Sequence, residues 1–185
     1  SELLQGLNDK QKEAVLHFEG PLLILAGAGS GKTRVLTHRI AYLIEERGVD
    51  PYRIMALTFT NKAANEMRER VDKIVTFGAG SVWVSTFHST CVRILRRYID
   101  FLDYSRSFTI YDSDDQKTLM KDICRSLNID TKKFREKSFL NEISRAKDEL
   151  KTPEMFAEEV SKEYNRKIYG TVYKEYQRRL KKNNA

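Results

Sequence analysis

Short apolar runs alternate with longer amphipathic segments in the first part of the chain. The apolar runs are residues 22–26, 54–58 and 82–86. The segments with helical spacing that follow them are 32–47, 61–75 and 88–99. This alternation predicts three strand–helix units, and parallel strands joined by helices form an open α/β sheet with helices on both faces. The turn after each strand is then expected at the edge of the sheet where ligands bind.

From about residue 105 onward the pattern is helical only. The expected helices cover residues 112–127, 131–147, 153–164 and 166–182. One apolar face repeats at i, i+4 and i+8, in Leu119, Ile123 and Leu127. Four tyrosines are interpreted as a buried stripe in preference to a DNA contact: Tyr164, Tyr169, Tyr173 and Tyr176. The pattern therefore divides the chain into an α/β part, 1–105, and a helical part, 106–185.

Charge adds a preference for an anionic partner. The 185 residues contain 33 basic and 26 acidic side chains, a net charge of +7. From residue 106 onward the net charge is +5, from 19 basic and 14 acidic residues, which leaves +2 for the rest. The helical part is thus the better candidate to contact a long polyanion, although a solvated charged helical surface gives the same composition.

The remaining composition indicates a cytoplasmic protein. No apolar run is long enough to span a bilayer, and the first residues lack the basic and apolar regions of a secretory signal. Cys91 and Cys124 lie in helical patterns and fit no metal-binding spacing. We expect both to be reduced thiols in the core, and we expect no membrane contact.

A glycine-rich turn follows the first apolar run. Residues 26–33 read Ala-Gly-Ala-Gly-Ser-Gly-Lys-Thr, with Ala26 where a P-loop usually has its first glycine. Glycines let successive N–H groups turn inward, and the helix N-terminus adds positive charge, so the turn is predicted to bind the phosphates of ATP. Lys32 would reach the β- and γ-phosphates, and the Thr33 hydroxyl would ligate Mg²⁺. The loop residues expected around the phosphates are Ala28, Gly29, Ser30 and Gly31.

Gln11 has two interpretations, and both stay open. Asn8 is a good N-cap for a short helix, and Gln11 occupies the third helical position, where it would complete a capping box. Its amide could instead read the hydrogen-bonding edge of adenine. The spacing alone favours the cap.

The turns after the second and third apolar runs each combine a phenylalanine with polar side chains. They read Thr-Phe-Thr-Asn-Lys at 58–62 and Thr-Phe-His-Ser at 86–89. Aromatic rings stack on any base, while hydroxyl, amide and imidazole groups hold phosphates, so the pair suits single-stranded nucleic acid. Taken singly, the two phenylalanines could be core residues, Asn61 a helix cap and His88 a hydrogen-bonding residue.

Four blocks together resemble the N-terminal part of superfamily 1 DNA helicases of the UvrD/Rep/PcrA type. They are Leu-Asn-x-x-Gln at 7–11, Leu-Ala-Gly-Ala-Gly-Ser-Gly-Lys-Thr-Arg at 25–34, Thr-Phe-Thr-Asn-Lys-Ala-Ala at 58–64 and Ser-Thr-Phe-His-Ser at 85–89. The resemblance covers essentially the whole chain. It implies a RecA-like P-loop NTPase, with part of the motor domain in 1–105 and a helical accessory subdomain near duplex DNA in 106–185.

The resemblance also implies a role for individual residues. Gln11 would read adenine, Arg34 would lie near the base, and Arg70 would approach the nucleotide. The residues implied to contact single-stranded DNA are Phe59, Thr60, Asn61, Thr86 and His88. The implied enzyme is an ATP- and Mg²⁺-dependent helicase that moves 3′→5′ on single-stranded DNA and acts at single-strand/duplex junctions. DNA repair is one pathway that the resemblance suggests, and replication and plasmid maintenance stay open beside it.

One acid needed for ATP hydrolysis is missing. A P-loop enzyme needs a second carboxylate to hold Mg²⁺, and the local candidate is Asp112 after residues 108–111. Ser113-x-x-Gln116 explains this stretch better as a helix start. In the family the acid lies further along, so we expect the chain to be a truncated piece that works with the C-terminal remainder of the helicase. Alone, it is expected to hydrolyse ATP slowly or not at all.

Two other functions are compatible with parts of the sequence. A small-molecule P-loop kinase would use the helical part as a substrate lid, but it should carry all its catalytic acids within this length. A non-catalytic nucleic-acid-binding module would tolerate a degenerate P-loop, whereas Gly31, Lys32 and Thr33 are all present.

Overall fold

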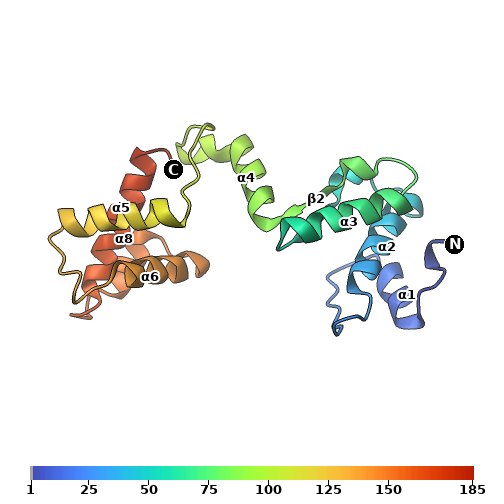
Figure 1. Cartoon of the computed structure of the whole chain (residues 1–185), viewed down its shortest axis with the longest axis horizontal. Helices are drawn as coiled ribbons and strands as arrows, with labels where there is room; N and C mark the ends of the chain where they lie inside the picture. Colours follow the sequence, from blue (N-terminus) through green and yellow to red (C-terminus); the bar gives the residue numbers. More distant parts are fainter. Residues whose placement is uncertain (1) are drawn as a thin grey trace. The chain divides into compact units, whose positions relative to one another are not determined.

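The computed structural model describes residues 2–185 (Figure 1). The chain forms two compact units, one ending at Ile94 and the other running from Leu95 to Ala185. The elements of the first are η1 (Glu2–Leu4), α1 (Asp9–Leu16), α2 (Lys32–Glu45), η2 (Pro51–Arg53), β1 (Met55–Thr58), α3 (Asn61–Ile74), η3 (Ala79–Ser81), β2 (Trp83–Thr86) and the beginning of α4 (Phe87–Tyr98). The elements of the second, after α4, are η4 (Ile99–Leu102), α5 (Ser113–Ser126), α6 (Glu136–Asp148), α7 (Pro153–Glu159) and α8 (Lys167–Lys182).

A small parallel sheet organises the first unit. β1 pairs with β2 in a register that sets Met55 opposite Trp83 and Thr58 opposite Thr86. The crossover helix α3 packs along the sheet (Figure 1) through its apolar face, which includes Met67. Because the two strands are parallel and in register, the turns that follow them lie at the same edge. The mixed α/β class and the parallel pairing of these two strands are confirmed.

The strand expected at residues 22–26 is not formed. Among the described residues the sheet has two strands, and residues 21–27 carry no regular structure. Leu23 and Leu25 are 83% and 87% exposed. An apolar run becomes a strand only when a neighbouring strand pairs its N–H and C=O groups. No strand of the described residues lies beside this one.

Helix ends in the second unit differ from the expected ones for local reasons. α5 begins with a capping box between Asp112 and Asp115, one residue earlier than the expected pair Ser113 and Gln116. α6 begins at Glu136 rather than 131, because the carbonyl of Asp130 accepts bonds in a preceding turn. α7 ends at Glu159 rather than 164.

No helix within residues 2–185 has the length and apolarity needed to cross a membrane.

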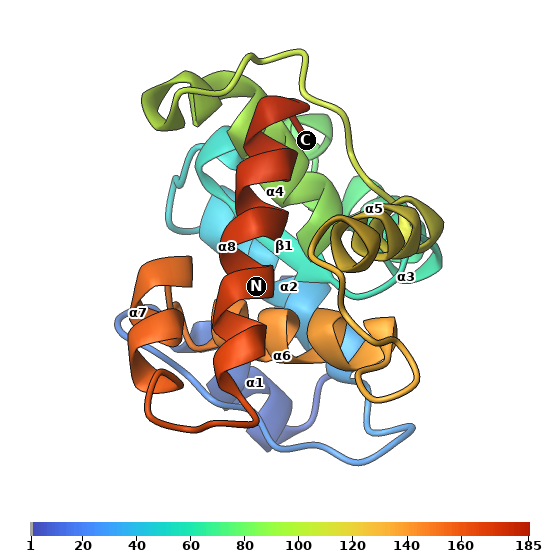
Figure 2. The ribbon, with the colours of Figure 1, turned by 90° about the vertical axis from the view of Figure 1, so that its left-hand side faces the viewer.

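The core of the second unit is built on α8. Figure 2 shows α8 with α5, α6 and α7 around it. Tyr173 and Tyr176 are buried, and Tyr169 is half-buried, which confirms the buried tyrosine stripe for these three. Tyr164 is 94% exposed, so the prediction was wrong for this ring, which lies in the loop between α7 and α8.

The two cysteines differ in burial. Both thiols are free. Cys124 is buried in the α5–α8 core, as expected. Cys91 lies on α4 and is exposed, so its assignment to the core was wrong.

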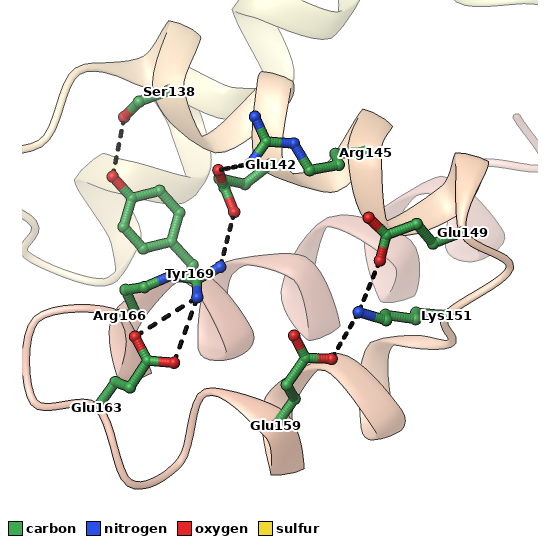
Figure 3. Close-up of polar contacts among 9 residues, drawn as sticks. All are labelled: Ser138, Glu142, Arg145, Glu149, Lys151, Glu159, Glu163, Arg166 and Tyr169. Atoms are coloured by element: carbon green, nitrogen blue, oxygen red, sulfur yellow. Dashed lines mark hydrogen bonds and ion pairs between the residues drawn. The ribbon is translucent and has the colours of Figure 1, made fainter.

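Polar contacts join the helices of the second unit at its surface (Figure 3). The Arg166 guanidinium donates to Glu142 of α6 over 3.0 Å and also contacts Glu163. Lys151 lies between Glu149 and Glu159, at 2.6 and 2.7 Å. Half-exposed pairs of this kind add little stability singly, so they mainly fix how the loops meet the helices.

We expect Gly170→Ala to destabilise the chain. Gly170 lies where α7 crosses α8, and a Cβ built there comes within 2.8 Å of the Ala157 Cα. Alanine favours a helix over glycine, but here the backbone must move, so we expect a loss of about 1–3 kcal/mol in the free energy of unfolding. Urea unfolding measures it. The control is Gly80→Ala, where a Cβ meets nothing within 4 Å. Equal stability of the two variants would contradict the prediction.

Protonation of Glu175 should lower the free energy of unfolding of the chain at acidic pH. Hydrogen bonds from Arg178 and Arg179 lower the pKa of Glu175 to about 2. A carboxylate with a lowered pKa stabilises the fold above its unfolded value, and this contribution is lost as pH falls toward the folded value. Glu175→Gln should therefore cost about 1 kcal/mol at pH 7, since one partner is largely exposed. Most of this cost should be lost as the pH falls to the folded pKa of about 2.

The measurement for Glu175 is urea unfolding at a series of pH values between 7 and 2. Glu158→Gln is the control, because Glu158 belongs to none of the ion pairs formed by residues 2–185. A difference between wild type and Glu175→Gln that does not change with pH would exclude the ion pair as its cause.

Candidate functional site

The glycine-rich loop leads directly into α2. Gly29 and Gly31 have φ values of 76° and 84°, a conformation that glycine adopts without strain. Gly31 is the N-cap of α2, and no side chain caps this helix. The N–H groups of its first turn are therefore left for an anion.

Lys32 closes the loop from the helix side. Its Nζ donates to the carbonyls of Ala26 and Gly27, at 3.1 and 3.0 Å. The Ser30 hydroxyl donates to the same Gly27 carbonyl over 2.6 Å. The loop thus holds an ammonium group next to uncapped N–H groups, with the half-buried Thr33 following it in the helix. The ammonium and N–H donors fit a phosphate chain, and the Thr33 hydroxyl oxygen fits a magnesium ion beside it.

Gln11 both caps α1 and contacts the loop. Its side-chain oxygen accepts from the Asn8 N–H at 3.0 Å, and the Asn8 oxygen accepts from the Gln11 N–H at 2.9 Å, which confirms the capping box. Its amide nitrogen also donates to the Ser30 carbonyl over 3.0 Å. A Cβ at Gly31 would lie 2.9 Å from this nitrogen. Glycine at position 31 therefore permits the close approach of helix α1 to the loop.

The two arginines lie in different surroundings. Arg34, in the first turn of α2, donates to the Gln5 carbonyl at 3.5 Å, so its guanidinium lies over the segment before α1. Arg70 is exposed on α3. Within residues 2–185, none of the hydrogen bonds joins Arg70 to the loop.

The turns after β1 and β2 form one hollow. It has a volume of about 480 Å³ and is lined by Thr58, Phe59, Thr60, Asn61, Thr86, Phe87, His88 and Ser89. The rings of Phe59 and Phe87 lie 5.3 Å apart between centroids, tilted by 33°. Phe59 is 89% exposed, so it is not a core residue. The structure therefore gathers all five residues predicted to contact DNA around one exposed aromatic pair.

Some residues of this hollow are held by hydrogen bonds that start the following helices, whereas others have exposed side chains. Thr60 caps α3, because its hydroxyl accepts from the Ala63 N–H, so the interpretation of Asn61 as the cap was wrong. The Thr86 hydroxyl is buried and bonded to Ser89, which lies in the first turn of α4. The side chains of Asn61 and His88 are exposed beside the two rings.

Three residues of the hollow were not among the predicted contacts: Thr58, Phe87 and Ser89. The strand register places Thr58 opposite Thr86, which brings the first of them to the edge. The signal in the sequence was that both turns contain Thr-Phe followed by polar residues. It identified the turns correctly but not every residue that lines the space between them.

Comparison with known proteins gives one consistent family. Residues 7–185 match the model of the UvrD/REP helicase N-terminal domain. The chain is 55% identical over 183 residues to the ATP-dependent DNA helicase PcrA of Staphylococcus aureus (strain NCTC 8325 / PS 47), covering 99% of this chain and 25% of that protein. The PcrA of Staphylococcus epidermidis (strain ATCC 12228 / FDA PCI 1200) matches with the same identity and coverage. The chain thus spans about a quarter of the length of these curated relatives.

The double role of Gln11 can be separated by substitution. Gln11→Ala removes the cap and the bond to Ser30, and should cost about 1 kcal/mol of unfolding free energy. Gln11→Glu keeps an acceptor for the Asn8 N–H but sets a carboxylate oxygen against the Ser30 carbonyl, so its cost reports the loop contact without the loss of the cap. Urea unfolding measures both. Gln5→Ala, at an exposed glutamine, is the control, and a Gln11→Ala variant as stable as this control would refute the double role.

Proposed function

Because the chain belongs to the UvrD/REP helicase N-terminal domain family, we propose that it forms the ATP-binding part of an ATP-dependent DNA helicase. The proposal includes a RecA-like P-loop motor that moves 3′→5′ on single-stranded DNA and opens duplex at strand junctions. It also includes a role in DNA repair and a cytoplasmic location. The remaining parts of the helicase would supply the other half of the motor.

One observation carries the nucleotide site: Lys32 and the uncapped start of α2 converge on a loop of left-handed glycines. In this proposal Lys32 binds the β- and γ-phosphates, Thr33 holds Mg²⁺, and backbone N–H groups from residues 28–31 surround the phosphates. Gln11 lies at the loop and would read adenine, with Arg34 near the base. ATP with Mg²⁺ supplies the phosphoanhydride bond whose hydrolysis drives movement. Arg70 is proposed to approach the nucleotide from α3.

The hollow beyond β1 and β2 is proposed as the strand site. The exposed Phe59 ring would stack on a base, while Thr60, Asn61 and His88 would contact the backbone of the strand. Since these residues begin α3 and α4, a small movement of either helix changes the grip on the strand. Thr86 is buried beside the hollow, and its hydroxyl would position the first turn of α4 for the strand.

Asp112 is proposed not to supply the second Mg²⁺ carboxylate. The backbone N–H groups of Asp115 and Asp114 donate to its side chain at 2.9 and 2.8 Å and lower the pKa of Asp112. Both bonds go to Oδ1, which is thereby used to cap α5. We therefore propose that the 185-residue chain alone has little or no ATPase activity.

The test is ATP hydrolysis, with and without oligo(dT), by the helicase that carries this segment and by the 185-residue chain alone. We expect strong stimulation by DNA in the helicase and almost none in the chain. Lys32→Ala should abolish turnover but leave binding of the strand without ATP. Phe59→Ala should weaken stimulation about tenfold, by the value of one stacked base.

Phe77→Ala is the matched control for Phe59→Ala, because Phe77 is 87% exposed and does not line the hollow. Hydrolysis indifferent to DNA would refute the motor and favour a small-molecule kinase. Strand-stimulated turnover by the chain alone would refute its proposed dependence on an external acid.

A further inference from the structure

A second groove lies on the helical unit, along α8. It consists of two hollows of about 410 and 440 Å³ that share Leu127, Lys167 and Thr171, and we call it the α8 groove. One hollow extends to Ala157 and Lys174, and the other to the loop containing Tyr164. The three shared residues place the two hollows next to each other along α8. The residues that line these two hollows belong neither to the nucleotide loop nor to the hollow at Phe59.

Basic side chains predominate along this groove. Its cations are Lys133, Lys167, Lys174 and Arg178, against the carboxylates Asp130 and Glu175. Glu175 is already neutralised by Arg178 and Arg179, at 2.8 and 2.7 Å. Asp130 accepts from the backbone N–H of Lys132. For the described part of the chain, the ion pairs do not involve Lys133, Lys167 or Lys174, so these three charges are available to an anion.

Lys167 and Lys174 lie on one face of α8. They are two helical turns apart, with Thr171 between them, and both line the groove. Two turns of helix span roughly 11 Å, a distance that two phosphates of one flexible strand can bridge.

The groove also offers surfaces for bases. The Tyr164 ring is 94% exposed at its rim, and Leu127, Ile129 and Ile168 give it an apolar floor. The amides of Asn128 and Asn165 line the same hollow and can bond to base edges. A duplex keeps its base faces stacked inside, so it has no use for an exposed ring or an apolar floor. A single strand uses both.

We propose that the α8 groove binds single-stranded nucleic acid, with a base stacked on Tyr164 and backbone phosphates held by Lys167 and Lys174. This site is separate from the hollow at Phe59 and goes beyond the proposed function, which requires only one strand site. It gives the helical unit a strand-binding role of its own.

The experiment is NMR titration of the ¹⁵N-labelled chain with the single strand dT10, without ATP, at several salt concentrations. We expect two groups of amides to shift, one at residues 58–61 and 86–89 and the other at 127–134 and 164–174. Tyr164→Ala should weaken binding about tenfold in the second group only. Phe59→Ala should affect the first group only.

The contribution of Lys167 and Lys174 is tested by measuring how Kd depends on salt concentration. Replacing both Lys167 and Lys174 by alanine should reduce the slope of log Kd against log salt by about 1.4 for the second group, since each phosphate contact contributes about 0.7. Lys121→Ala is the control, because Lys121 is exposed on α5 and does not line the groove. All of these residues are exposed, so the variants should fold.

Two outcomes would overturn the proposal. One is a dT10 titration that shifts only the amides at 58–61 and 86–89. The other is a blunt duplex that shifts the groove amides as strongly as dT10 and is unaffected by Tyr164→Ala, which would make the groove a duplex site. Both readouts are independent of ATP, so a failure of the proposed motor function would leave this result standing.

Discussion

The pairing of β1 with β2 is the constraint on which the candidate strand site depends. Thr58 lies opposite Thr86, so the residues that follow them leave the sheet at one level and bring Phe59 within 5.3 Å of Phe87. A slip of one residue would shift one turn by about 3.3 Å and reverse which side chains of that strand face α3. Burial of one face of the sheet therefore fixes the strand register, and the register places the rings of Phe59 and Phe87 next to each other.

The nucleotide loop depends on a different kind of contact, between segments far apart in the chain. The amide of Gln11 is fixed by its own helix through Asn8, and it meets Ser30 only because Gly31 leaves room. Adenine would need both hydrogen-bonding ends of that amide. Reading the base and holding the loop would therefore draw on the same side chain, which links recognition of the base to the shape of the phosphate site.

Local signals in the sequence predicted local structure well. Asn8 and Pro153 marked helix starts correctly, and the similar make-up of the two turns predicted that they lie together at one edge of the sheet. Features that depend on distant partners could not be predicted in the same way. The apolar run at 22–26 has strand composition but no neighbour among residues 2–185, and Tyr164 continued a helical spacing that ends earlier, at Glu159.

The extended segment before the loop has a consequence for the behaviour of the chain in solution. It exposes Leu23 and Leu25, and among the described residues no backbone hydrogen bonds outside helices and strands involve positions 21–25. Such a segment is a template for pairing with a second copy. The net charge of +7 opposes this by mutual repulsion, which salt screens over about 10 Å at 0.1 M. Pairing of this segment between copies would therefore be opposed by electrostatic repulsion at low ionic strength and would become more favourable as salt is added.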